Sequence, residues 1–184
     1  STFEEIVFLL WNGRLPSKEE LASLEDELKG NREVPVAIWD LARSLPKDAV
    51  PMETLRTAVS ALSAFDSARD DISQEASRLK AMQLVAKTPT VIAGMYRISQ
   101  GKDPVPSNHS LSVAADFLHM LNGEIPTDIA AKSLDVGLIL HAEHELNAST
   151  FAGRVIAATA SDMYSSITGA LGALKGPLHG GANE

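Results

Sequence analysis

Three histidines and two small polar residues in the last quarter of the chain are the residues whose types and spacing could do chemistry. Four of them are close together in the sequence: His141, His144, Asn147 and Ser149. The fifth, His179, follows after an apolar stretch rich in small residues. Histidine exchanges protons near neutral pH, so histidines with hydroxyl and amide neighbours are typical of acid–base or oxyanion-stabilising sites. If the intervening helices fold back as a hairpin, these side chains converge on one pocket.

His141 and His144 are three residues apart, so on a helix they share a face and could bind one ligand or one metal ion. The segment His-Ala-Glu-His-Glu lacks the i, i+4 histidine spacing of the zinc proteases, and no third ligand is identifiable. We therefore predict no metal here. From the residues alone, ordinary helix-end histidines are the preferred interpretation, and a histidine metal site is the alternative.

His179 lies in the segment Gly-Pro-Leu-His-Gly-Gly. Glycines let a backbone approach a ligand closely, and proline fixes the geometry at the entry to the loop. Such loops commonly present catalytic groups, and the alternative is a loop histidine in solvent. For Asn147 and Ser149 the alternative is a role as cap or turn residues at the start of a helix.

Helix signals recur from end to end, and sustained strand-like alternation is absent, so the sequence predicts an all-α fold. Thr2 with Glu5 and Ser17 with Glu20 are predicted capping boxes. Further helices are predicted at residues 35–44, 51–65, 73–99, 110–121, 127–145 and 148–173. Residues 102–108 are predicted as a loop.

Two of these helices carry interruptions. Pro89 removes a backbone donor and predicts a kink or break near Thr88. The last helix is predicted to bend or split near residues 161–162, with Asp162 as an N-cap. After Asp162, small residues recur every three to four positions and leave a flat strip for close helix packing.

The bulk composition limits the function classes. With 184 residues, 45% apolar and 22% charged, the chain fits one soluble domain, and its net charge of −8 argues against nucleic acid as a partner. The absence of cysteine excludes a disulfide framework and a thiolate nucleophile. Apolar stretches such as residues 136–140 are far shorter than the roughly 20 residues of a membrane span. We expect a cytoplasmic protein that binds no membrane.

Two ordered segments resemble the citrate synthase family. Residues 144–149, His-Glu-Leu-Asn-Ala-Ser, resemble its oxaloacetate-side histidine segment, and residues 176–184, Gly-Pro-Leu-His-Gly-Gly-Ala-Asn-Glu, resemble its catalytic-histidine loop. Residues 3–7, 12–16 and 96–102 are similar in kind, so the resemblance covers essentially the whole chain. It implies a partial large helical domain over residues 1–184, without the family's small domain.

The resemblance also implies an activity. The enzymes of this family condense acetyl-CoA with oxaloacetate to give citrate and free CoA, with the CoA thioester as substrate and no metal or redox cofactor. A 2-methylcitrate synthase that uses propionyl-CoA shares these motifs. One methylene of substrate is worth only about 1 to 3 kcal/mol in a pocket, so a few side chains could decide between the two acyl groups. A homodimer is implied as well, with the small-residue helices after Asp162 at the interface.

The resemblance gives each candidate residue a role. His179 is expected to hydrogen-bond the thioester carbonyl as a catalytic residue, and His144 to bind and polarise the ketone of oxaloacetate. Asn147 is expected in the same substrate pocket, and Ser149 is expected to orient the catalytic histidine. His141 is expected to help shape the pocket, with a buried, hydrogen-bonded structural histidine as the alternative.

The rest of the family's site is expected beyond Glu184. It comprises the catalytic aspartate, a second substrate histidine and the arginines that hold the carboxylates of oxaloacetate. We therefore expect the chain to be a fragment that is inactive by itself. A hypothesis of another class is a helical scaffold that uses the same surface to bind protein partners.

Overall fold

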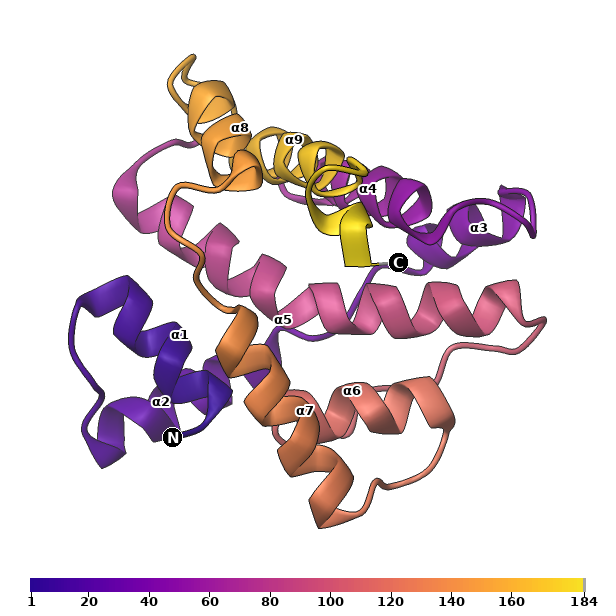
Figure 1. Ribbon diagram of the computed structural model, residues 1–184, viewed down its shortest axis with the longest axis horizontal. Coiled ribbons are helices and arrows are strands. Elements are labelled where there is room, and N and C mark those ends of the chain that lie inside the picture. Colours follow the sequence, from indigo (N-terminus) through magenta and orange to yellow (C-terminus); the bar gives the residue numbers. More distant parts are fainter. Residues whose placement is uncertain (184) are drawn as a thin grey trace. The chain divides into compact units, whose positions relative to one another are not determined.

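The computed structural model describes residues 1–183, with side chains as far as Gly181, and within this part it holds helices and turns but no strand (Figure 1). The all-α prediction is confirmed. The chain divides into two compact units. The first comprises residues 1–33, 82–97 and 103–144, and the second comprises residues 34–81, 98–102 and 145 onward.

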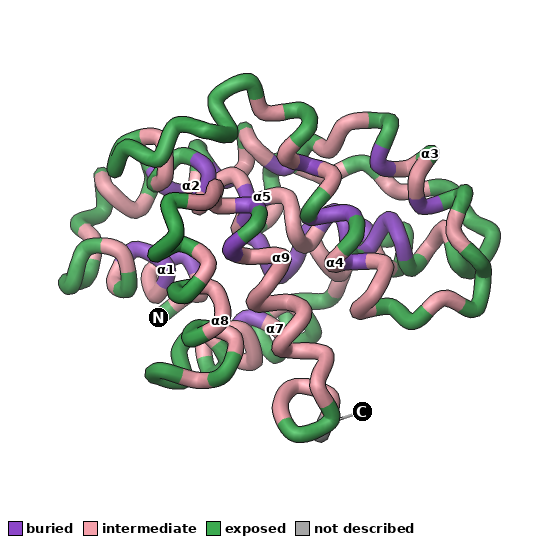
Figure 2. The backbone as a smooth tube through the Cα atoms, turned by 90° about the horizontal axis from the view of Figure 1, so that it is seen from above, coloured by how far each residue is buried: buried purple, intermediate pink, exposed green. Residues whose placement is uncertain are grey.

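Four helices lie wholly in the first unit, and a long fifth helix contributes to both units. They are α1 (Phe3–Asn12), α2 (Lys18–Gly30), α6 (Val113–Asn122) and α7 (Asp128–His141), together with α5 (Gln74–Ser99). Both predicted capping boxes are present at the starts of α1 and α2. The core of the unit is formed by apolar side chains from four helices: Val7, Phe8, Leu24, Leu28, Met82, Ala86 and Val113. Figure 2 shows such buried positions recurring along the helices.

Buried carboxylates join helices of the first unit. Asp135 of α7 accepts a hydrogen bond from the backbone N–H of Phe3 at 2.8 Å, and only 8% of Asp135 is exposed. Because the first N–H groups of a helix have no partner within it, this carboxylate caps α1 from another helix.

A buried ion pair holds the loop before α6. Arg32 donates to Asp116 at 3.0 Å and to the carbonyl of Leu111 at 3.0 Å. Asp116 also accepts from the Ser107 hydroxyl and from the backbone N–H of Asn108. The C-terminal end of the predicted loop is therefore tied down by one buried carboxylate.

In the second unit, α9 (Met163–Leu174) lies between two other helices that it contacts, α4 (Pro51–Leu62) and α8 (Ala148–Ala157). The unit also holds α3 (Val36–Ser44) and the 3-10 turns η1 (Ser63–Phe65) and η2 (Gly180–Asn183). The helix α9 packs against both α8 and α4 (Figure 1). The phenol of Tyr164, at the start of α9, donates to Asp66 after η1 at 3.1 Å.

The predicted small-residue strip packs inside the chain. A Cβ added at Gly169 would lie 2.1 Å from Ile156 Cδ1, so α8 and α9 approach closely at this point. The predicted split of the last helix is confirmed, because Asp162 is the N-cap of α9 and accepts a hydrogen bond from Ser165. The residue Ala160 in the turn before it has a left-handed φ of 60°.

Several predicted helix ends and one predicted interruption differ from the structure. Of the two outcomes expected at Pro89, a break is wrong, because α5 continues through it. The helix predicted from residue 110 begins at Val113, since Asn108 accepts from both the N–H and the hydroxyl of Ser110 and so diverts the chain into a turn. The helix predicted as far as residue 145 ends at His141.

No helix among residues 1–183 combines the length and the apolar character needed to cross a membrane.

Candidate functional site

The second unit brings Ser149 and His179 together. Ser149 lies in the first turn of α8, after the N-cap Asn147, and His179 lies in the loop that follows α9. The hairpin of α8 and α9 places Ser149 Oγ 2.8 Å from His179 Nε2. The hydroxyl can donate to an unprotonated Nε2 or accept from Nε2–H, and in either case it restricts the orientation of the ring.

The loop that carries His179 folds back onto the end of α9. The backbone N–H of His179 donates to the carbonyl of Gly176 at 2.9 Å. A Cβ added at Gly180 would lie 2.5 Å from the carbonyl oxygen of Leu174, and one at Gly181 would lie 2.8 Å from that of Lys175. These two positions therefore need glycine, because the backbone approaches itself too closely for any side chain. The sequence had suggested close approach to a ligand, which stays a prediction.

The first unit brings His141 and His144 together at the end of α7. Their ring centroids are 6.0 Å apart with an interplanar angle of 71°. His141 Nδ1 lies 2.7 Å from the carbonyl oxygen of Gly137, so Nδ1–H is the donor in this contact.

Two expectations about this pair are wrong. His144 does not share a helical face with His141, because α7 ends at His141 and the chain turns at Glu145, whose φ is 55°. His141 is hydrogen-bonded but exposed, which contradicts the alternative of a buried structural histidine.

Asn147 is a helix cap. Its Oδ1 accepts a hydrogen bond from the backbone N–H of Thr150 at 3.0 Å. The cap interpretation is confirmed for Asn147 but not for Ser149, whose hydroxyl is directed to His179 instead. The substrate role of Asn147 stays a prediction.

The pair of Ser149 and His179 belongs to the second unit, and the pair of His141 and His144 belongs to the first. In the part of the chain with described residues, no group of three His, Cys, Asp or Glu side chains is arranged to hold a metal ion.

The structure adds an ion pair that the sequence pattern did not predict. Lys175, directly after α9, contacts the carboxylate of Glu53 in the first turn of α4. The lysine was visible in the sequence as the residue before the Gly-Pro-Leu-His segment. Its partner was not, because 122 residues separate the two.

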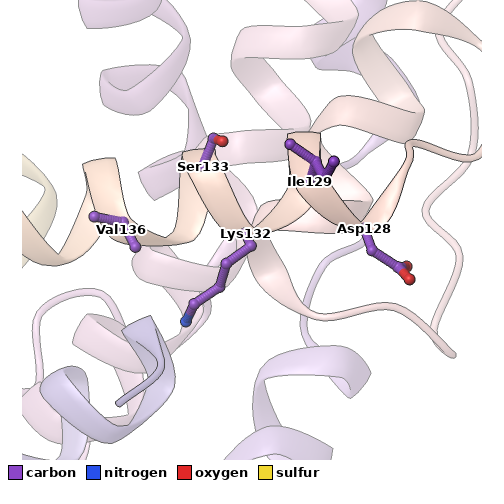
Figure 3. Close-up of a pocket in the computed structure, with 5 residues that line it drawn as sticks. All are labelled: Asp128, Ile129, Lys132, Ser133 and Val136. Atoms are coloured by element: carbon purple, nitrogen blue, oxygen red, sulfur yellow. The ribbon is translucent and has the colours of Figure 1, made fainter.

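A hollow of about 610 Å³ lies along the outer side of α7 (Figure 3). It is lined by residues of α7 alone: Asp128, Ile129, Lys132, Ser133 and Val136. None of these lining residues is a predicted site residue, so the hollow includes neither the pair of Ser149 and His179 nor the pair of His141 and His144.

The comparisons with known proteins identify the family. A family model described as "Citrate synthase, C-terminal domain" matches residues 1–184. The chain belongs to the citrate synthase family, as the two histidine segments indicated.

Individual relatives agree with this assignment. The chain is 49% identical to citrate synthase 2 of Bacillus subtilis strain 168, covering 100% of this chain and 50% of that protein. It is 45% identical to the 2-methylcitrate synthase of Mycobacterium tuberculosis strain H37Rv, covering 100% of this chain and 46% of that protein.

A solved structure is also similar. It is the ternary complex of carboxymethyl coenzyme A and oxaloacetate with the citrate synthase of the thermophilic archaeon Thermoplasma acidophilum. The TM-score is 0.90 at 33% identity, covering 99% of this chain and 48% of that one. The chain therefore spans about half the length of the relatives that it matches.

Proposed function

We propose that this chain supplies the histidine part of the active site of an acyltransferase, which condenses acetyl-CoA with oxaloacetate to give citrate and free CoA. The observation that carries the proposal is the 2.8 Å contact between Ser149 Oγ and His179 Nε2. A hydroxyl on one ring nitrogen restricts the orientation of the ring and leaves the other nitrogen for a substrate. The ligands named for the Thermoplasma acidophilum complex support a CoA thioester and oxaloacetate as that substrate pair.

The chemistry requires a fixed donor at the thioester oxygen. Removing a proton from the methyl carbon of the thioester generates an enolate whose oxygen is strongly basic, and a positioned hydrogen bond lowers that barrier. When Ser149 donates to Nε2 of His179, Nδ1 carries the proton and donates to the thioester carbonyl oxygen. We infer that the base comes from outside residues 1–184, since the chain spans about half the length of its relatives.

The condensation itself forms one carbon–carbon bond. The enol carbon attacks the ketone carbon of oxaloacetate, and the ketone oxygen takes up a proton. Water then cleaves the thioester bond and yields citrate and the CoA thiol. We assign the polarisation of the ketone to His144, which is exposed beyond the end of α7. Asn147 uses its Oδ1 as the cap of α8, which leaves its amide N–H groups as donors for the anionic substrate.

The acyl group has two candidates. Propionyl-CoA in place of acetyl-CoA would make the protein a 2-methylcitrate synthase. The Mycobacterium tuberculosis relative that carries that name supports this second candidate.

A thiol-release assay tests the proposal. Acetyl-CoA and propionyl-CoA are each supplied with oxaloacetate to the full-length protein that contains this chain, and to residues 1–184 alone. We expect turnover by the full-length protein only, and the better donor identifies the acyl group. No turnover with either donor would contradict the proposal and favour a helical scaffold.

Variants of the full-length protein separate catalysis from folding. We expect His179→Ala to lower kcat by about 10²- to 10³-fold, because it removes an oxyanion donor. Ser149→Ala is expected to lower kcat by less, because the ring remains but loses its orientation. The control is His109→Ala, which removes an exposed histidine from a loop of the first unit. Equal activity of His179→Ala and the control would contradict the assignment.

We also propose a homodimer. The strip at Gly169 is covered by Ile156 of the same chain, so it is not the contact surface by itself. On α8, Phe151 and Val155 are 59% and 50% exposed and lie one helical turn apart. We expect the double variant Phe151→Ser, Val155→Ser to sediment at half the wild-type mass. An unchanged dimer mass would contradict this surface.

A further inference from the structure

The base of the His179 loop is fastened to a second helix. Lys175 is the C-cap residue of α9, and the next residue, Gly176, begins the loop. The Nζ of Lys175 forms an ion pair with Oε1 of Glu53. Since Glu53 lies in the first turn of α4, the pair joins the last residue before the loop to a separate helix.

The loop that carries His179 packs directly on the backbone around Lys175. The carbonyls of Leu174 and Lys175 lie against Gly180 and Gly181, with no space for a Cβ between them. His179 is held between these contacts and the hydrogen bond from its own N–H to Gly176. A shift of Lys175 is therefore transmitted to the imidazole through tightly packed backbone.

A second cation, Arg56, also favours the charged form of Glu53. Arg56, one helical turn further along α4, adds to the attraction of Lys175, and the two cations hold the pKa of Glu53 below its usual value, with Lys175 the larger cause. Arg56 also lies under α9, since a Cβ added at Gly172 would be 3.9 Å from its Cδ. The anchor thus consists of the ion pair of Glu53 and Lys175, with the charge of Arg56 nearby on α4.

The ends of α9 are both tied to the same neighbour. Tyr164 at its start contacts Asp66 beyond the end of α4, and Lys175 at its end contacts Glu53 at the start of α4. The two helices therefore run antiparallel, and the ion pair fixes the position of α9 along α4 at the end next to His179.

We propose that Glu53 and Lys175 are positioning residues that hold the His179 loop in its working orientation. The inference rests on the proposed function, because it concerns the same histidine. The side chains of Lys175 and Glu53 are 38% and 43% exposed, so their pair adds little to the stability of the fold. Its effect is on geometry, where a 1 Å misplacement of a catalytic group can cost about 10²-fold in rate.

Steady-state kinetics of full-length variants test this role. Glu53→Gln and Lys175→Met are each expected to lower kcat by about tenfold, with little change in the KM for oxaloacetate. The double variant is expected to lose no more than either single one, because both remove the same interaction. Lys175→Arg keeps the charge and is expected to retain most of the activity.

The matched control is the ion pair of Arg14 and Glu20 in the first unit, at 58% and 37% exposure. Glu20→Gln in this pair should leave kcat unchanged, and thermal unfolding should give similar midpoints for all variants. The inference is overturned if kcat of Glu53→Gln and Lys175→Met stays within about twofold of wild type, or if Lys175→Arg loses as much as Lys175→Met.

The same data separate this inference from the proposed function. If the wild-type full-length protein shows no turnover, the proposed function fails, and the positioning role fails with it. If the wild type turns over and the anchor variants match it, only the positioning role fails.

Discussion

The carboxylate of Glu4, in the first turn of α1, accepts a hydrogen bond from the backbone N–H of Val113, the first residue of α6, at 2.9 Å. Only 4% of Glu4 is exposed. One helix of the first unit thus caps another, and Asp135 of α7 caps α1 in turn. This unit therefore depends on buried carboxylates as well as on its apolar core.

The cap at α6 can be tested by Glu4→Ala. The substitution leaves a buried N–H without a partner, so we expect the free energy of unfolding to fall by about 1 to 3 kcal/mol. Urea denaturation measures this loss. Glu27→Ala, on the exposed face of α2, is the control and should change stability by less than about 0.5 kcal/mol. Equal losses in the two variants would contradict the capping role.

The buried pair of Arg32 and Asp116 predicts a larger effect. Burial lowers the pKa of Arg32, and the charge of Asp116 opposes this shift. Asp116→Ala leaves a guanidinium buried without its partner, so we expect a loss of about 3 to 5 kcal/mol by chemical denaturation. The double variant Arg32→Met, Asp116→Leu removes both charges and is expected to be more stable than Asp116→Ala. A double variant that is less stable than the single one would argue against an electrostatic cause.

The close approach of α8 and α9 predicts a specific pair of compensating substitutions. Gly169→Ala places a Cβ against Ile156 Cδ1, so we expect a loss of about 1 to 3 kcal/mol from overpacking. Ile156→Val removes the clashing atom, so it should recover much of that loss when combined with Gly169→Ala. Thermal unfolding of the two single variants and the double variant measures the coupling. Strictly additive losses would show that the two side chains do not meet.

The contact between Arg14 and Glu20 predicts an acid-shifted titration. Hydrogen bonds from Arg14 and from the backbone of Ser17 lower the pKa of Glu20 from 4.5 to about 2. Because this pKa is depressed in the folded state, its contribution to stability is present above pH 4.5 and is lost as the pH falls through 2. Carboxyl chemical shifts recorded by NMR should give a midpoint near 2 for Glu20, and Arg14→Met should raise it. A midpoint near 4.5 in the wild type would refute the contact.

Local sequence signals account for much of the fold. The capping boxes at Thr2 and Ser17 and the N-cap at Asp162 were predictable because a cap needs only residues three positions apart. The helix end at His141 was missed, because an apolar pattern continues past it to Leu146 while the backbone turns at Glu145. Periodicity alone does not reveal a left-handed residue that is not glycine.

The candidate site, too, has a part that the sequence predicts and a part that depends on the tertiary structure. The sequence by itself determined the family, a glycine-rich loop around His179, and the residue types able to carry acid–base chemistry. The family resemblance led us to expect that Ser149 orients His179, with a cap role as the alternative, and the tertiary structure decided between the two; only the structure showed that Lys175 is anchored by Glu53. Both contacts join residues far apart in the chain, and such partners depend on how helices pack, which no local pattern of residues encodes.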